Sequence, residues 1–226
     1  MRIAERRARL SFPALVLVTD SARQPQRETT GEAWLDDIVR EAVLGGVSIV
    51  QLREKHLERG DLIALGLHIR DAIAGRAMLF VNSNVDAAIA LGADGVHLPE
   101  RALPTGAVRD RVGERMLISR AVHSIDAAVR AERAGADVLQ AGTLFATQSK
   151  PGAPLLGPNG LSEVCAAVDL PVIAIGGIDA QNAAEALGAG AQGVAVIGAI
   201  LNADEPREAA AALRRTIDSI GLSGAA

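Results

Sequence analysis

Cationic and amide side chains follow the apolar run of residues 47–52. Gln51 is the last but one residue of this run, and Arg53 and Lys55 stand two residues apart just after it, within the segment QLREK. If the extended backbone continued, Arg53 and Lys55 would point the same way. Guanidinium and ammonium groups suit phosphate and carboxylate ligands. The segment therefore predicts an anion site, although a solvated charge run that pairs with its own acids is an open alternative.

Two further apolar runs end in polar residues. Asn82 ends the run 77–82, and the segment TLFATQSK after the run 137–142 contains Thr147, Ser149 and Lys150. Hydroxyl groups beside an ammonium group also suit a phosphate or a carboxylate. We expect these four residues to bind substrate together with Gln51, Arg53 and Lys55.

Glycines end the last two apolar runs of the chain. Gly176 and Gly177 follow VIAI, and Ile197 and Gly198 follow GVAV. Glycine lets backbone N–H groups approach an anion closely, which predicts that these four residues bind phosphate. The alternative is that the glycines only permit tight turns.

One histidine, His123, directly follows the apolar run 116–122. An imidazole with an ordinary pKa near 6.5 can act as a general acid or base at neutral pH. His123 is therefore the candidate catalytic residue, with capping of the following helix as the alternative.

The same run ends offer no convincing metal site. Glu54 and Glu100 are the nearby acids, and each stands next to arginine or lysine. The single cysteine, Cys165, excludes a site built from several thiolates. We therefore expect no metal and no other cofactor.

The elements that must position these residues alternate along the chain. Apolar runs with the character of buried strands occupy residues 15–19, 47–52, 77–82, 95–98, 116–122, 137–142, 172–177 and 193–198. Segments with apolar residues three and four apart, such as 34–44, 61–75, 124–135 and 182–190, separate several of them and predict helices. This order predicts an α/β fold, a single (β/α)₈ TIM barrel of parallel strands over residues 1–226, with 1–12 as a solvated or helical N-terminal arm.

An open doubly wound sheet is the competing fold. It is disfavoured because LVTDSARQ follows the first run where a dinucleotide-binding sheet would carry G-x-G-x-x-G. In a barrel, the carboxyl ends of all strands meet at one mouth, which would bring the candidate residues together.

Composition limits the classes of partner. Aromatic residues make up 2% of the chain and the formal net charge is −4, which argues against a nucleic-acid partner. No apolar stretch is long enough to span a membrane. The lone cysteine and the absence of an export signal favour a cytoplasmic protein. We expect a small phosphorylated ligand and allow for a homodimer.

Taken in order, these segments resemble the superfamily of thiamine phosphate synthase and TenI-type thiazole tautomerase. The resemblance rests on QLREK (51–55), FVNSNVDAAIALGADGVHLP (80–99), SRAVHS (119–124), GTLFATQSK (142–150), VIAIGGI (172–178) and GVAVIGAI (193–200). It implies a thiamine-biosynthesis enzyme whose ligand is a thiazole phosphate.

Departures from the synthase pattern favour the tautomerase branch. Synthases in this superfamily carry aspartates where this chain has Ser83 and Ala102, and a serine where it has Ala121. Two lost carboxylates would remove ligands for the Mg²⁺ that a synthase needs. The resemblance thus implies an isomerase: a metal-independent thiazole tautomerase in which His123 transfers the proton.

Two alternatives stay open. One is a synthase that joins hydroxymethylpyrimidine diphosphate to thiazole phosphate, in which Gln51, Arg53, Lys55 and Lys150 bind the pyrimidine diphosphate and Mg²⁺ is needed. The other is a regulator or carrier that binds thiazole or thiamine phosphate without turnover.

Overall fold

The strands of the computed structural model form a closed barrel. The structure describes residues 3–23, 33–149 and 151–221, and within them eight parallel strands pair in chain order, with β1 completing the circle against β8. The strands are β1 (Ala14–Val18), β2 (Ile49–Leu52), β3 (Met78–Asn82), β4 (Gly95–Leu98), β5 (Leu117–Val122), β6 (Val138–Ala141), β7 (Val172–Ile175) and β8 (Gly193–Val196). The predicted (β/α)₈ barrel is confirmed.

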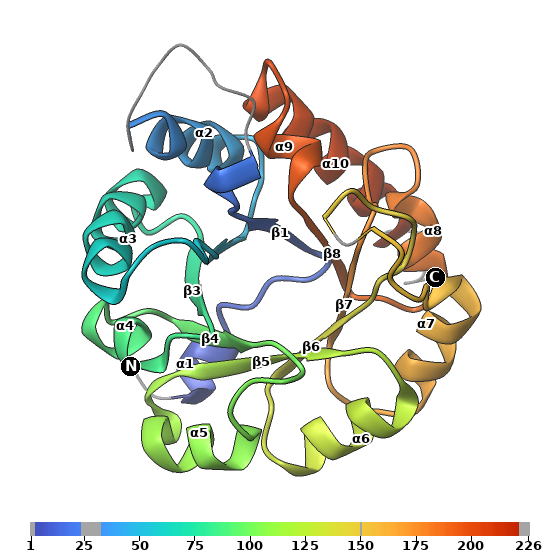
Figure 1. The fold of residues 1–226 in the computed structure, drawn as a ribbon. Coiled ribbons are helices and arrows are strands. Elements are labelled where there is room, and N and C mark those ends of the chain that lie inside the picture. The colour runs from blue at the N-terminus through green and yellow to red at the C-terminus, as the bar shows by residue number, and fades with distance from the viewer. Residues whose placement is uncertain (1–2, 24–32, 150, 222–226) are drawn as a thin grey trace.

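Helices connect the strands and surround them as a ring (Figure 1). They are α2 (Ala33–Leu44), α3 (Arg59–Ile73), α4 (Val85–Ala90), α5 (Thr105–Val112), α6 (Ile125–Arg133), α7 (Gly157–Ala166), α8 (Ala183–Gly188), α9 (Gly198–Leu201) and α10 (Pro206–Gly221). Short 3₁₀ turns, η1 (Ser21–Arg23) and η2 (Gly113–Arg115), follow β1 and α5. None of the described helices is both long enough and apolar enough to cross a membrane.

Observed strand ends differ from the predicted ones by a few residues. The predicted run 47–52 begins with Val47, whose N–H instead donates to the Ala42 carbonyl at the end of α2. The run 172–177 ends at Ile175, because Gly176 and Gly177 leave the sheet with φ values of +111° and +64°. Apolar character alone does not mark where a chain leaves the hydrogen-bond ladder.

Two apolar clusters stabilise the barrel. Side chains such as Val16, Ile49, Leu117 and Ile173 fill its interior, and a larger cluster of mainly Leu, Ile, Val and Ala lies between strands and helices. Gly95 makes room in the interior, since a Cβ there would lie 2.3 Å from a ring carbon of Phe80. Both clusters are mainly aliphatic, as expected for a chain in which aromatic residues make up 2%.

The N-terminal helix α1 (Ile3–Arg7) lies at the end of the barrel where the strands begin (Figure 1). Ile3 and Leu10 pack against the interior cluster. Arg6 forms an ion pair with Asp94 at 2.9 Å, and Arg7 forms one with Asp137 at 2.6 Å. The described part of the predicted N-terminal arm is thus partly helical and closes the bottom of the barrel.

Candidate active site

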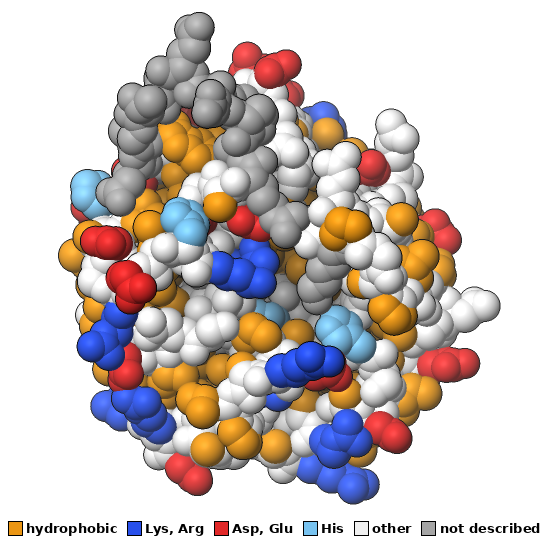
Figure 2. All heavy atoms as spheres, in the orientation of Figure 1, with side chains coloured by type: hydrophobic (Ala, Val, Ile, Leu, Met, Phe, Trp, Pro, Cys, Tyr) orange, Lys and Arg blue, Asp and Glu red, His pale blue; other side chains and the backbone are white. Residues whose placement is uncertain are grey.

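A cavity of about 790 Å³ opens at the carboxyl ends of the strands. Nearly all of the predicted site residues line it: Gln51, Arg53, Lys55, Asn82, His123, Thr147, Ser149, Gly176, Gly177, Ile197 and Gly198. Figure 2 shows Lys and Arg side chains in blue, with a His side chain in pale blue nearby, around the middle of this face. Lys150 lies outside the described residues.

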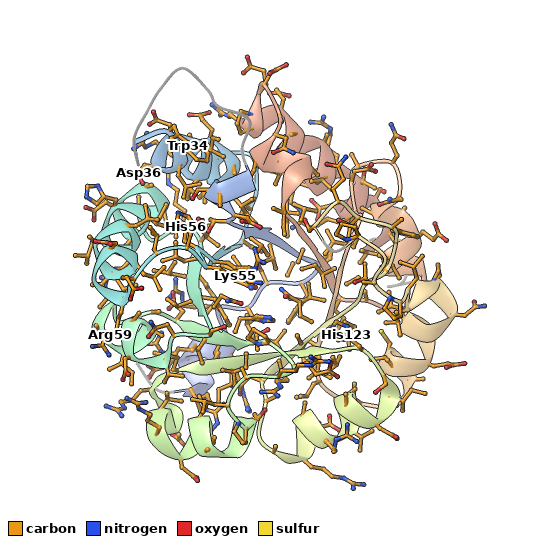
Figure 3. The ribbon with its side chains drawn as sticks, viewed as in Figure 1. Trp34, Asp36, Lys55, His56, Arg59 and His123 are labelled. Carbon is orange, nitrogen blue, oxygen red and sulfur yellow. The ribbon has the colours of Figure 1, made fainter. Side chains whose placement is uncertain are left out.

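The cationic part of the cavity is held in place by the end of β1. Arg53 forms a 2.6 Å ion pair with Asp20, and both side chains are largely buried. The backbone N–H of Arg53 donates to the Thr19 hydroxyl at 2.9 Å. Lys55 lies inside the ring of helices, whereas Arg59 lies at its edge (Figure 3). The loop after β2 therefore presents its cations to the cavity from a fixed backbone.

The side chain of Glu54, between Arg53 and Lys55, points away from the cavity. Its side chain is fully buried, and Oε2 accepts hydrogen bonds from the Ser21 N–H at 2.9 Å and the Ser21 hydroxyl at 2.5 Å. It does not line the cavity. Glu54 ties the loop after β2 to the loop after β1, which is a supporting role.

Two glutamines form the floor of the cavity. Gln140 of β6 donates from Nε2 to Oε1 of Gln51 on β2 at 3.1 Å, and each residue is 3% exposed. Beside them, Nδ1 of buried His97 lies 3.0 Å from the Ser119 hydroxyl. The two amides close the cavity from below. A polar ligand that enters through the mouth can contact them only from above.

Glycines form the wall at the ends of β7 and β8. A Cβ on Gly176 would lie 2.6 Å from Cγ2 of Thr143, and a Cβ on Gly177 would lie 2.4 Å from the Ala146 carbonyl oxygen. Both positive φ values and this close packing require glycine. The backbone after β7 therefore lies directly against the loop after β6, which carries Thr147 and Ser149.

His123 is fixed through one ring nitrogen. Nδ1 donates to the Gly142 carbonyl, which assigns the proton to that nitrogen and leaves Nε2 as the other functional atom. Nε2 lies 3.9 Å from Oε2 of Glu100, and the His123 side chain is 36% exposed. Figure 3 places His123 near the carboxyl end of β5, inside the ring of helices.

Arg120, a second polar residue of β5, faces away from the cavity. Its guanidinium donates to the carbonyls of Leu103 and Glu100 at 2.7 and 2.6 Å. Burial lowers the pKa of Arg120, while the Glu100 carboxylate acts in the opposite direction. Arg120 holds the loop between β4 and α5 and so places Glu100 near His123.

Comparisons with known proteins agree with this geometry. A family model described as thiamine monophosphate synthase matches residues 15–200. The chain belongs to the thiamine monophosphate synthase family. It is 42% identical to a thiamine-phosphate synthase of Roseiflexus sp. (strain RS-1), over 85% of this chain and 83% of that protein. It is 44% identical to a thiamine-phosphate synthase of Methanoculleus marisnigri, over 83% and 90%.

A solved structure supports the same assignment. The thiamine phosphate pyrophosphorylase from Pyrococcus furiosus superposes with a TM-score of 0.82 and 33% identity, covering 95% of this chain and 98% of that one. Family membership is thus supported in sequence and in structure.

The prediction of a thiazole tautomerase, and so of an isomerase, is wrong. Relatives in the thiamine monophosphate synthase family that are 42% and 44% identical over most of the chain are named synthases, which are transferases. The prediction depended on Ser83, Ala102 and Ala121. Three local departures carry less weight than similarity that extends over the whole barrel.

Magnesium is the metal that the family resemblance implies, and the side chains present do not fit it. No group of three or more His, Cys, Asp or Glu in the described parts of the chain could hold a metal ion. Asp20 is paired with Arg53, and Asp179 accepts from the backbone N–H groups of Gln181 and Asn182. Hard cations need several oxygen ligands, and Asp20 and Asp179, two of the acids that line the cavity, are already engaged in these contacts.

Asp20 and Gln140 are among the polar residues of the cavity that sequence reasoning missed. Asp20 is the second residue after β1, so the strand-end rule was sufficient to find it. Gln140 lies within the apolar run DVLQAG, where only knowledge of which residues face inward would have singled it out.

Proposed function

We propose that this protein is a thiamine-phosphate synthase, a transferase that joins hydroxymethylpyrimidine diphosphate to a thiazole phosphate and releases diphosphate. The observation that carries the proposal is that one cavity is lined by two chemically different sets of groups, each suited to an anion. Side-chain cations follow β2, and backbone N–H groups of a glycine wall follow β7 and β8. Two anionic substrates, a diphosphate and a phosphate, need two such regions.

The cationic region suits the diphosphate. Arg53 offers a planar fork of donors held by Asp20, and Lys55 adds a second positive charge. Asn82 lines the same side of the cavity and adds an amide donor. Positive charge here would stabilise the negative charge that develops on diphosphate as it leaves.

The glycine wall suits the phosphate of the thiazole. Gly176 and Gly177, with Ile197 and Gly198, would bind it through backbone N–H groups, which barrels commonly use at this position. Thr147 and Ser149 lie on the adjoining loop, which would place their hydroxyls near the ring.

The reaction forms a carbon–nitrogen bond to the thiazole as the carbon–oxygen bond to diphosphate breaks. The nitrogen attacks with its lone pair, so no proton has to leave the thiazole. His123 therefore has no proton to shuttle in this reaction. We assign it a substrate contact through Nε2, because Nδ1 is engaged by the Gly142 carbonyl.

The test is a two-substrate assay with purified protein. Each substrate is supplied alone and both together, in MgCl₂ and in excess EDTA, and thiamine phosphate and diphosphate are quantified. We expect equal amounts of both products only when both substrates are present. Failure to form thiamine phosphate under any of these conditions, beside an active synthase from one of the relatives, would overturn the proposal.

A further inference from the structure

We infer that Gln140 is a positioning residue for the pyrimidine substrate: it fixes the amide of Gln51 so that the NH₂ group of Gln51 faces the ligand. This inference rests on the proposed function, because it concerns the ring of the diphosphate substrate. Gln140 is not among the residues to which the family resemblance assigns a role in substrate binding.

The hydrogen bond between the two amides spans the barrel. β2 and β6 are four strands apart in the closed order β1 to β8, so Gln51 and Gln140 project from opposite walls. Nε2 of Gln140 lies 3.1 Å from Oε1 of Gln51, and both residues are almost fully buried. A side chain that reaches across the lumen sets the depth to which a ligand can enter.

The neighbouring positions leave each amide with few other partners. On the strands beside Gln51, the residues in register are Val18 and Phe80. On the strands beside Gln140, they are Ala121 and Ile173. These four side chains are apolar, so none of the in-register neighbours offers either amide a side-chain hydrogen-bond partner.

The direction of this bond determines what the ligand must offer. The carbonyl oxygen of Gln51 accepts from Gln140, so the NH₂ group of Gln51 is the part available to a ligand, as a donor. The carbonyl oxygen of Gln140 is likewise an acceptor. The floor of the cavity therefore matches a ring edge with an acceptor nitrogen beside an amino donor, which an aminopyrimidine has and a plain aromatic ring lacks.

Two substitutions distinguish orientation of the Gln51 amide by Gln140 from a role in which the Gln140 side chain only fills space inside the barrel. Gln140→Met keeps a similar volume and removes the donor. Gln140→Glu replaces the donor by a carboxylate, so the Gln51 amide would have to turn and present its carbonyl oxygen to the ring. We expect Gln140→Glu to weaken pyrimidine diphosphate binding at least tenfold and Gln140→Met to weaken it less.

The measurement is calorimetric binding of hydroxymethylpyrimidine diphosphate, benzyl diphosphate and thiazole phosphate to the wild type and both variants. Benzyl diphosphate carries the diphosphate without the ring nitrogens. We expect the wild type to prefer the pyrimidine at least tenfold over benzyl diphosphate, Gln140→Glu to abolish that preference, and thiazole phosphate affinity to change less than twofold. Thermal melting checks that each variant is folded.

Several results would overturn the inference. These are an unchanged pyrimidine preference in folded Gln140→Met and Gln140→Glu, an equal loss for all three ligands, and a wild type with no preference for the pyrimidine. The proposed function fails separately: if the wild type prefers the pyrimidine and the variants lose that preference, but no thiamine phosphate forms, the positioning role stands and the synthase assignment does not.

Discussion

Arg53 shows how one side chain is prepared for an anion before any ligand arrives. Its guanidinium is paired with Asp20, and its backbone N–H is bonded to Thr19, so its position depends on the end of the neighbouring strand. A positioned cation loses less side-chain entropy on binding than a mobile one. The loop after β2 is therefore a preformed part of the site.

Replacing Arg53 by Met tests its contact with diphosphate. A hydrogen bond to a charged group contributes about 1.5–3 kcal/mol, which corresponds to a loss of roughly 10- to 150-fold in kcat/KM for the pyrimidine diphosphate. Steady-state kinetics with each substrate varied in turn measure this loss. Arg76→Met, an exposed arginine just before β3 at the other end of the barrel, is the matched control and should leave both values unchanged.

The sequence located most of these residues, because the carboxyl ends of apolar runs are recognisable without a structure. It could not assign which residues face inward. Ser119 and Ala121 point into the barrel, so Arg120 between them points out. Gln140 was missed for the same reason. A strand that is buried on both faces shows no alternation of polar and apolar residues, so its sequence does not reveal which residues face the barrel interior.

At the scale of elements, the loop after β7 and the loop after β6 form one unit. The Leu144 N–H donates to the Ile175 carbonyl and the Phe145 N–H to the Gly176 carbonyl, each at 2.9 Å.

Strand positions were predictable because strands buried on both faces form continuous apolar runs. This loop pairing was not, because it depends on contacts between segments about 30 residues apart.

Gly177→Ala tests this unit. The left-handed φ of +64° and a Cβ 2.4 Å from the Ala146 carbonyl oxygen would force the loops apart, at a cost of about 1–3 kcal/mol in stability. We expect KM for thiazole phosphate to rise about tenfold or more, with a smaller change in KM for the pyrimidine diphosphate.

The matched control for this prediction is Gly188→Ala in α8. No atom lies within 4 Å of a Cβ built there, and alanine favours a helix by up to about 1 kcal/mol over glycine. Denaturant unfolding and the two KM values compare the variants. Equal kinetics for Gly177→Ala and Gly188→Ala would exclude a phosphate site at the glycine wall.

At the scale of the whole molecule, the two ends of the barrel have different tasks. The mouth holds the candidate active site, whereas the opposite end holds ion pairs between α1 and the residues just before β4 and β6. Asp137 has a fully buried side chain that pairs with Arg7 at 2.6 Å and Arg109 at 2.5 Å and accepts from the Ile118 N–H at 2.8 Å. This carboxylate joins α1, α5 and two strands.

Asp137→Ala should therefore change stability rather than activity. The loss should be about 1.5–3 kcal/mol, because the Ile118 N–H and the Arg109 guanidinium lose their acceptor, while the arginines that remain stay partly exposed to water. Denaturant unfolding measures the loss, and kcat/KM of the protein that stays folded should be within about twofold of the wild type. Asp110→Ala, at an exposed acid of α5, should change stability by less than about 0.5 kcal/mol. A large loss of kcat/KM in folded Asp137→Ala would contradict this division.

The position of α1 also affects how the chain is made. Arg7 meets Asp137 only after 130 further residues have been added, which takes roughly 7–26 s at ribosomal rates of about 5–20 residues per second. During that time Ile3 and Leu10 have no barrel interior to cover. Helix α1 therefore leaves the ribosome before the strands it covers and is buried only once they have formed, so a nascent chain would expose its apolar, arginine-rich residues to chaperones during that interval.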